Sequence, residues 1–296
     1  MLHEVSSLFV SQGVPLNGRI YRTHDAARER QPAVIVTGSW LTVQQQMPAL
    51  YARLLAARGL TAFTFDFAGW GASGGALRCA ELPLCKVEDI RSAAHYLAAQ
   101  SFVDPERIAL LSVCASAQYA LRALLTDAPI KAFASVAGWF HDAATVAPFY
   151  GGESGVARRI ERATRALERF AGSGELSYVP AYAPGDDRAG MHFELDYYGN
   201  PERGAVASWP NRMAELSWLH WLSYDGLTPA ARVQTPTLLV HSDGCALPDN
   251  ARRVHAALAG PKALAWLDGT QTDYYDQPPQ LSAAVERATA FFMEAM

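Results

Sequence analysis

The chain lacks the features that mark several classes of protein. It has no long run of Lys or Arg, and its formal net charge is only -4 with a pI near 6.1, so it has no electrostatic footprint for nucleic acid or an anionic membrane. It contains no stretch of eighteen apolar residues, and its first residues do not combine a basic segment with an apolar run. We therefore expect a cytoplasmic protein that acts on a small molecule, with no nucleic-acid or membrane partner.

Cysteine is also scarce. The four cysteines are Cys79, Cys85, Cys114 and Cys245. They show no C-x-x-C spacing, and four are too few to stabilise a chain of 296 residues by disulfide bonds. No Gly-rich phosphate cradle outside the turn described below follows a strand. The sequence therefore predicts neither a metal site nor a disulfide framework, and it predicts no cofactor.

Alternating strand and helix patterns indicate an α/β protein. With 50% hydrophobic and 18% charged residues, the chain can bury a large core. The apolar runs 33–37 and 61–65 are typical of buried strands, and the segment 46–59 between them has helical spacing, an early proline and a final glycine. Further buried strands are predicted at 132–136 and 235–241. This order favours a mostly parallel sheet.

A long interval between two of these strands predicts an inserted cap. Roughly one hundred residues separate the strand near Ala137 from the one near Pro236, far more than a crossover needs. We assign residues 139–225 to a cap, and residues 1–138 and 226–296 to the core. The cap is rich in aromatic residues, which either close a small core or form the wall of a ligand pocket. The residues expected to bind substrate are Trp139, His141, Trp218 and Trp221.

The segment 107–122 predicts a buried strand, a sharp turn and a helix, with Cys114 at the apex. It has the shape of the nucleophile elbow G-x-S-x-G, with Ser112 and Ser116 at the glycine positions and a thiol in place of the hydroxyl. The flanking residues must be small because the two backbones nearly touch at this strained turn. The alternative is a buried structural cysteine. As a nucleophile, Cys114 is expected to have a pKa lowered by the helix N-terminus, so that it attacks without a base.

Together with the turn 66–75 and the loop Gly38-Ser39-Trp40, this elbow resembles the α/β-hydrolase superfamily, most closely its dienelactone-hydrolase-like and peptidase-like members. The resemblance implies the α/β-hydrolase fold, with a mainly parallel eight-stranded sheet, helices on both faces and an active site above the strand ends. It also implies an oxyanion hole formed by the backbone N–H groups of Ala115 and of Ser39 or Trp40.

The chain departs from this family at the catalytic histidine. In the family, the loop after the last strand carries this histidine, but here Gln271 occupies its place. An amide cannot take up and return a proton, so the usual acid–base step is missing. The catalytic acid is expected to be Asp243, with Asp142 as a second candidate whose alternative role is a helix cap. Among the histidines, His220 in the cap is the best substitute base and His141 the second.

Three functions remain open. The first is acyl chemistry at Cys114 on an ester, thioester or lactone of a medium-sized apolar or aromatic metabolite. The second is a repurposed, non-hydrolytic enzyme, an isomerase, cyclase or lyase, that uses the oxyanion hole and the aromatic pocket. The third is a binding protein that only kept the fold. Blocking Cys114 by alkylation separates the first from the others. An exposed sheet edge or the cap would allow a homodimer.

Overall fold

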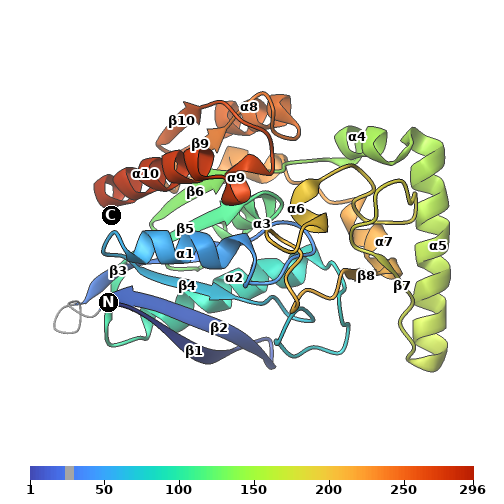
Figure 1. The fold of residues 1–296 in the computed structure, drawn as a ribbon, viewed down its shortest axis with the longest axis horizontal. Coiled ribbons are helices and arrows are strands. Elements are labelled where there is room, and N and C mark those ends of the chain that lie inside the picture. Colours follow the sequence, from blue (N-terminus) through green and yellow to red (C-terminus); the bar gives the residue numbers. More distant parts are fainter. Residues whose placement is uncertain (24–29) are drawn as a thin grey trace.

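An eight-stranded sheet forms the centre of the molecule (Figure 1). The computed structural model describes residues 1–23 and 30–296. The strands are β1 (Leu2–Ser11), β2 (Val14–Thr23), β3 (Gln31–Thr37), β4 (Thr61–Phe65), β5 (Val103–Val113), β6 (Ala132–Val136), β9 (Thr237–His241) and β10 (Lys262–Trp266). Their order in the sheet is β1-β2-β4-β3-β5-β6-β9-β10. β2 pairs antiparallel with β1 and β4, and all other neighbours are parallel. The predicted mostly parallel sheet is confirmed.

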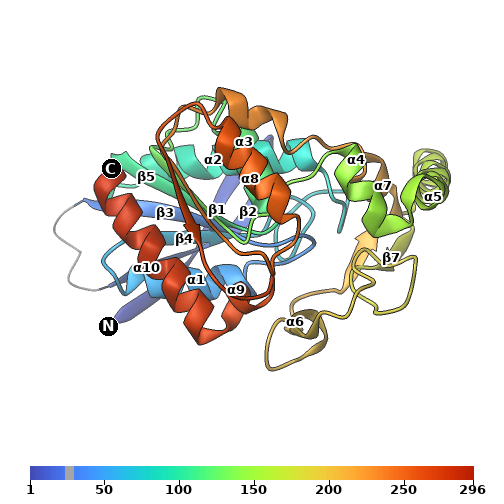
Figure 2. The same ribbon diagram turned by 90° about the horizontal axis from the view of Figure 1, so that it is seen from above.

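Helices cover both faces of the sheet (Figure 2). On one face lie α1 (Met47–Ala56) and α10 (Pro278–Ala295), and on the other lie α2 (Pro83–Ala98), α3 (Ser116–Ala123) and α8 (Pro248–Ala257). Because both faces are covered, the central strands are buried along their whole length without alternation, as β4 with all five residues buried illustrates. Helix α1 has the predicted proline in its first turn, and Gly59 beyond its end takes a positive φ of 92°.

The chain between β6 and β9 forms a separate group of elements beside the carboxyl ends of the strands, in which one long helix, α5, accompanies several short elements (Figure 1). The elements are α4 (Ala143–Val146), η2 (Ala147–Tyr150), α5 (Gly152–Ser173), β7 (Tyr178–Pro180), α6 (Asp196–Gly199), β8 (Arg212–Ala214), η3 (Glu215–Ser217), α7 (Trp218–Trp221) and η4 (Thr228–Arg232). Since β6 and β9 are paired neighbours, the chain leaves the sheet and returns to it at adjacent strands. The predicted limits of the cap, 139 and 225, stay a prediction.

A buried ion pair lies where this group meets the core. Lys86 Nζ is 2.7 Å from Glu81 Oε2, and their side chains are only 4% and 0% exposed. Tyr119 donates its hydroxyl to the other carboxylate oxygen of Glu81 at 2.6 Å. The backbone N–H of Glu81 donates to Ser217 Oγ at 2.9 Å, which ties the inserted segment to the core. Removing either charge would leave the other buried without its partner.

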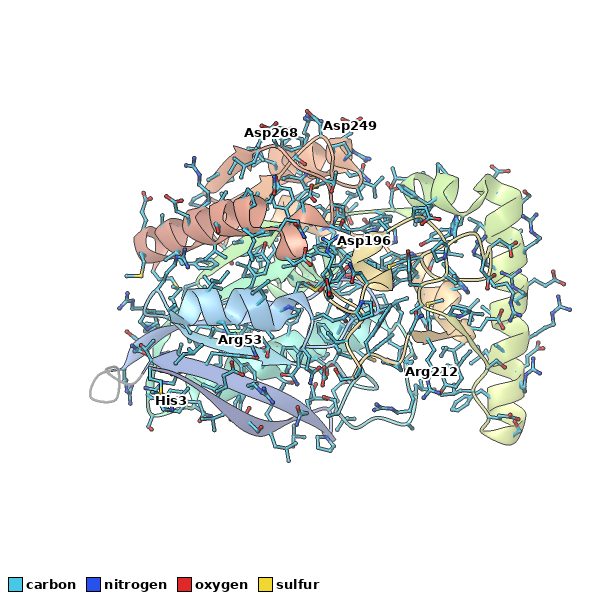
Figure 3. The ribbon with its side chains drawn as sticks, in the orientation of Figure 1. His3, Arg53, Asp196, Arg212, Asp249 and Asp268 are labelled. Carbon is cyan, nitrogen blue, oxygen red and sulfur yellow. The ribbon has the colours of Figure 1, made fainter. Side chains whose placement is uncertain are left out.

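Charged side chains otherwise lie mainly at the periphery, as Arg212, Asp249 and Asp268 illustrate in Figure 3. Within residues 1–23 and 30–296, no helix is both long and apolar enough to cross a membrane. In the same part of the chain, no group of three or more His, Cys, Asp or Glu side chains is arranged to hold a metal ion.

Candidate active site

The predicted strained turn is present at Cys114. This residue lies between the last residue of β5 and the start of α3, and its φ of 59° falls in the left-handed region that side chains with a Cβ rarely adopt. Serine replaces the usual flanking glycines because the Ser112 and Ser116 hydroxyls both find a buried partner. The Thr37 Oγ1 atom lies 2.8 Å and 2.9 Å from them. The turn therefore presents the thiol beyond the end of the sheet while its neighbours stay hydrogen-bonded.

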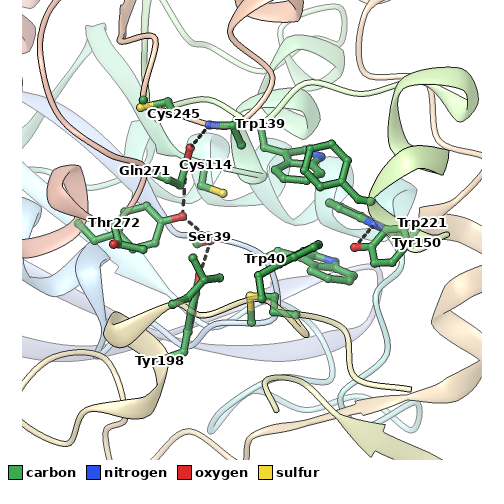
Figure 4. A pocket seen from close by; sticks show the side chains of 17 residues that line it. Ser39, Trp40, Cys114, Trp139, Tyr150, Tyr198, Trp221, Cys245, Gln271 and Thr272 are labelled. Atoms are coloured by element: carbon green, nitrogen blue, oxygen red, sulfur yellow. Dashed lines mark hydrogen bonds between the residues drawn. The ribbon is translucent and has the colours of Figure 1, made fainter. Parts of the chain in front are cut away.

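A cavity of about 270 Å³ lies beside Cys114 (Figure 4). Its wall is mostly aromatic and comes largely from the inserted segment: Trp40, Trp139, Phe149, Tyr150, Phe193 and Trp221. Its polar end is formed by Cys114, Ser39, Tyr198, Gln271 and Tyr275. Among the described residues that line the cavity, none is Asp, Glu, Lys, Arg or His. The cavity is therefore suited to an uncharged ligand with an apolar body.

The aromatic wall is held from behind by His141. The indole Nε1 of Trp139 donates to His141 Nδ1 at 2.7 Å, and His141 Nε2 lies 2.8 Å from the carbonyl oxygen of Trp221. The imidazole is therefore neutral, with its proton on Nε2. Burial lowers the pKa of His141 to about 4. Trp221 in turn stacks on Trp40 with ring centroids 4.1 Å apart.

Two of the residues predicted to bind substrate lie behind this wall. His141 is fully buried and does not line the cavity. Trp218 is also fully buried, with its ring edge-on to Tyr150 at 4.9 Å, and it does not line the cavity either. Trp139 and Trp221 do line it. The prediction thus has to be corrected for His141 and Trp218, whose role is to pack the wall.

His220 is not placed as the predicted base. His220 lies on the one-turn helix α7, in which Trp218 and Trp221 are buried on the inner face. Its own side chain points outward. It is exposed and lines a separate open pocket with Arg122 and Asp225. The proposed base is therefore turned away from the Cys114 cavity.

Four donors surround the sulfur of Cys114. They are the backbone N–H groups of Trp40 and Ala115 and the hydroxyls of Ser39 and Tyr275. Ala115 and Trp40 are among the residues whose N–H groups the α/β-hydrolase resemblance assigns to an oxyanion hole, with Ser39 as the alternative to Trp40, and that role stays a prediction. Burial raises the pKa of Cys114, and the four hydrogen bonds lower it by less. This direction is opposite to the expected one, because desolvation of a thiol that is only 6% exposed outweighs the end of an eight-residue helix.

The amide of Gln271 is fixed in one orientation. Its Oε1 accepts from the backbone N–H of Ala246 at 2.9 Å, while its Nε2 donates to Ala137 O at 2.8 Å and to Tyr275 Oη at 3.2 Å. From Tyr275 the hydroxyl contacts continue to Ser39 Oγ at 3.2 Å and on to Tyr198 Oη at 2.8 Å (Figure 4). Gln271 therefore lines the cavity at the start of a chain of hydroxyl groups.

Neither predicted acid lines the cavity. The Asp243 side chain is 74% exposed and forms an ion pair with Arg252 on the surface. Asp142 caps α4 by accepting from Thr145 N at 2.8 Å, which is its alternative role. His241, whose ring nitrogens face the backbone carbonyl oxygens of Ser242 and Gly138, is a buried structural histidine. The described lining of the cavity thus contains a thiol and hydrogen-bond donors but no Asp, Glu or His.

Comparison with known proteins agrees with this geometry. No protein-family model matches the chain. The uncharacterized protein PA2218 of Pseudomonas aeruginosa is 29% identical over 297 residues, covering 95% of this chain and 78% of that protein. Its crystal structure covers 100% of this chain and 94% of that one with a TM-score of 0.86. The crystal structure of the α/β hydrolase GrgF from Penicillium sp. sh18 covers 100% of this chain and 99% of that one, with 20% identity and a TM-score of 0.83. The protein has the α/β-hydrolase fold.

A third relative has an enzyme name. The acyltransferase drtE of Aspergillus calidoustus is 24% identical over 277 residues, covering 86% of this chain and 82% of that protein.

The sequence analysis missed Tyr275, which lines the cavity with Cys114. Tyr275 lies four residues after Gln271, in α9 (Asp273–Asp276), and its hydroxyl is hydrogen-bonded to Gln271 and Ser39. The sequence DYYD carries no pattern that distinguishes Tyr275 from the adjacent Tyr274, whose hydroxyl donates to Asp268 O instead. The one available signal was the spacing of four from Gln271, which places two side chains on the same side of a helical turn. Cys245, a second thiol in the cavity wall, was also missed.

Proposed function

We propose that the protein is an acyl-transfer enzyme in which Cys114 takes an acyl group from an uncharged thioester. The observation that carries this proposal is the position of Cys114, at a φ of 59°, between an apolar cavity and the backbone N–H groups of Trp40 and Ala115. The fold shared with an α/β hydrolase and the similarity to a named acyltransferase support the reaction class.

The lining of the cavity favours a thioester over an ester or lactone. When the Cys114 sulfur attacks a thioester, its bond to the acyl carbon forms, the bond from that carbon to the substrate sulfur breaks, and the thiol proton ends on the leaving sulfur. The attacking and leaving thiols have similar pKa values, so this exchange is nearly balanced. An alkyl ester would release an alkoxide, which needs a general acid. The cavity lining offers no His, Asp or Glu among the described residues to supply one.

The same lining favours transfer over hydrolysis. In this proposal the N–H groups of Trp40 and Ala115, which lie at Cys114, stabilise the negative oxygen of the tetrahedral intermediate. The acyl-thioester on Cys114 is then released by an acceptor. Water is a poor acceptor without a base, whereas a thiol or an amine brings its own nucleophilicity. A cavity of about 270 Å³ holds an acyl group of medium size.

The test compares a benzoyl thioester of N-acetylcysteamine with ethyl benzoate. Intact-protein mass spectrometry should find a benzoyl adduct with the thioester only, and peptide mapping should locate it on Cys114. Cys114→Ala should abolish the adduct, whereas Cys85→Ala, a matched removal of a half-buried cysteine outside the cavity, should not. An adduct that survives Cys114→Ala, or forms equally well with the oxygen ester, would refute the proposal.

The fixed amide of Gln271 favours a second candidate, a non-hydrolytic isomerisation, cyclisation or elimination. An amide oriented by Ala246 and Ala137 keeps a substrate oxygen or nitrogen in place but moves no proton. Such an activity would survive Cys114→Ala, so the same variant separates the two candidates.

A further inference from the structure

We propose that Tyr275, anchored by Gln271, donates the hydrogen bond that stabilises the reacting sulfur of Cys114, in place of an imidazole. This inference rests on the proposed role of Cys114 as the nucleophile. It adds a catalytic residue, because the proposed hydrogen bond acts on the reacting atom itself, in the cavity that both residues line.

Gln271 fixes part of the hydrogen bonding of the Tyr275 hydroxyl. Gln271 Nε2 lies 3.2 Å from Tyr275 Oη and can only donate, so the tyrosine oxygen accepts from it. The Tyr275 proton then has two acceptors, Ser39 Oγ at 3.2 Å and the sulfur of Cys114, which lines the same cavity. Ser39 Oγ also lies 2.8 Å from Tyr198 Oη; when Ser39 accepts from Tyr198 and donates to Tyr275, the Tyr275 proton is left for the sulfur. A hydrogen bond from Tyr275 is accordingly among the causes that lower the pKa of Cys114.

The hydrogen bonds of Gln271 allow its side-chain amide only one orientation. Its oxygen accepts from Ala246 N at 2.9 Å, so its NH2 group must face Ala137 O and Tyr275 Oη. If the amide were turned over, its oxygen would face the Ala137 carbonyl oxygen and its NH2 group the Ala246 N–H. Gln271 is therefore a positioning residue that acts through Tyr275.

Tyr275 is also protected from losing its proton. Its side chain is only 1% exposed, and burial raises its pKa well above 10. It therefore remains a donor throughout the neutral range and is no base. As the thiol proton leaves toward the substrate's leaving sulfur, negative charge grows on Cys114, and a donor already in place strengthens its hydrogen bond without reorganising.

The experiment measures how readily Cys114 loses its proton. Alkylation of Cys114 by iodoacetamide is followed by mass spectrometry across a pH series in the wild type, Tyr275→Phe and Tyr274→Phe. Loss of a hydrogen bond to a charged group should move the midpoint for Tyr275→Phe up by about one to two pH units. Tyr274→Phe removes the adjacent hydroxyl, which donates to Asp268 O, and should leave the midpoint unchanged. Equal midpoints for the wild type and Tyr275→Phe would overturn the proposal.

A second variant covers the case in which Tyr275→Phe does not fold. Gln271→Met keeps the Tyr275 hydroxyl but removes its anchor, and it should shift the midpoint in the same direction by a smaller amount. An unshifted midpoint in this variant would then overturn the positioning role. The thioester adduct assay separates the two levels of inference. An adduct without a midpoint shift refutes the role of Tyr275 alone, whereas a shift without an adduct refutes the proposed function alone.

Discussion

Replacing Gln271 by histidine should weaken the fold without creating an efficient esterase. The amide satisfies Ala246 N, Ala137 O and Tyr275 Oη at once, whereas a neutral imidazole has one donor and one acceptor. At least one buried group therefore loses its partner. This loss costs about 1–3 kcal/mol and corresponds to a fall in Tm of roughly 2–12 °C.

The new imidazole would also lack an orienting carboxylate. Asp243 pairs with Arg252 at the surface, and Asp142 is held by Thr145 at the start of α4. A well-oriented general base accelerates a reaction by about 10²–10⁴, but removing the orienting carboxylate of a triad loses about 10⁴. We therefore expect Gln271→His to raise the hydrolysis of nitrophenyl acetate by less than about tenfold.

The measurements are a thermal melt and a nitrophenyl acetate assay on the wild type, Gln271→His and Gln271→Asn. The asparagine variant keeps an amide but shortens it, so it reproduces the lost hydrogen bonds without adding an imidazole. A rise in hydrolysis of about a hundredfold or more with an unchanged Tm would refute the reasoning, because a carboxylate would then have to reach the site.

Stability should fall as the pH drops from about 6.5 to about 4, because burial lowers the pKa of His141 to about 4 and the unfolded chain takes up the proton first. The free energy of unfolding should be about 3 kcal/mol lower at pH 4 than above pH 6.5. Measured by urea unfolding, this free energy should depend less on pH in His141→Gln than in the wild type, and an equal dependence would contradict the role given to His141. Peptide mapping at pH 7 should find the half-buried Cys85 alkylated before Cys114, because burial raises the pKa of both thiols but only 6% of Cys114 is exposed to the reagent; the reverse order would argue against this prediction. Glu81→Gln should lower the free energy of unfolding by about 3–5 kcal/mol because Lys86 would keep a buried charge without its partner, and a loss below about 1 kcal/mol in denaturant unfolding would show that water reaches the pair.

The fold could be predicted because its signals are local. The apolar runs of β3 and β4 reflect burial on both faces of the sheet, which only a parallel α/β arrangement imposes on consecutive strands. The elbow was recognisable because a strained turn between a strand and a helix admits only small neighbours, here Ser112 and Ser116. Both constraints act within a few residues and are visible in one sequence.

The cavity could be predicted only in part, because its composition depends on which way side chains face. From the sequence, residues 218–221 were interpreted as one aromatic site. In the structure they form a single helical turn, on which the two tryptophans are buried and His220 is exposed. His141 looked like a polar cavity group, whereas its nitrogens bind Trp139 and the Trp221 carbonyl. The pKa of Cys114 was misjudged for a similar reason, since desolvation is a property of the packed site and not of the turn.

Because β6 and β9 are neighbours in the sheet, the segment between them can be replaced or changed in length. The sheet itself holds the two ends of residues 137–236 side by side, through parallel pairs such as Phe133 with Thr237. Because closing a flexible loop costs only about 0.6 kcal/mol more for each doubling of its length, this segment can grow, shrink or be grafted from another protein with little strain on the sheet. Cys114 lies on the sheet side of that boundary, on the turn between β5 and α3, whereas most of the aromatic wall lies in the inserted segment. The aromatic wall and the Cys114 turn can therefore be altered separately in this chain.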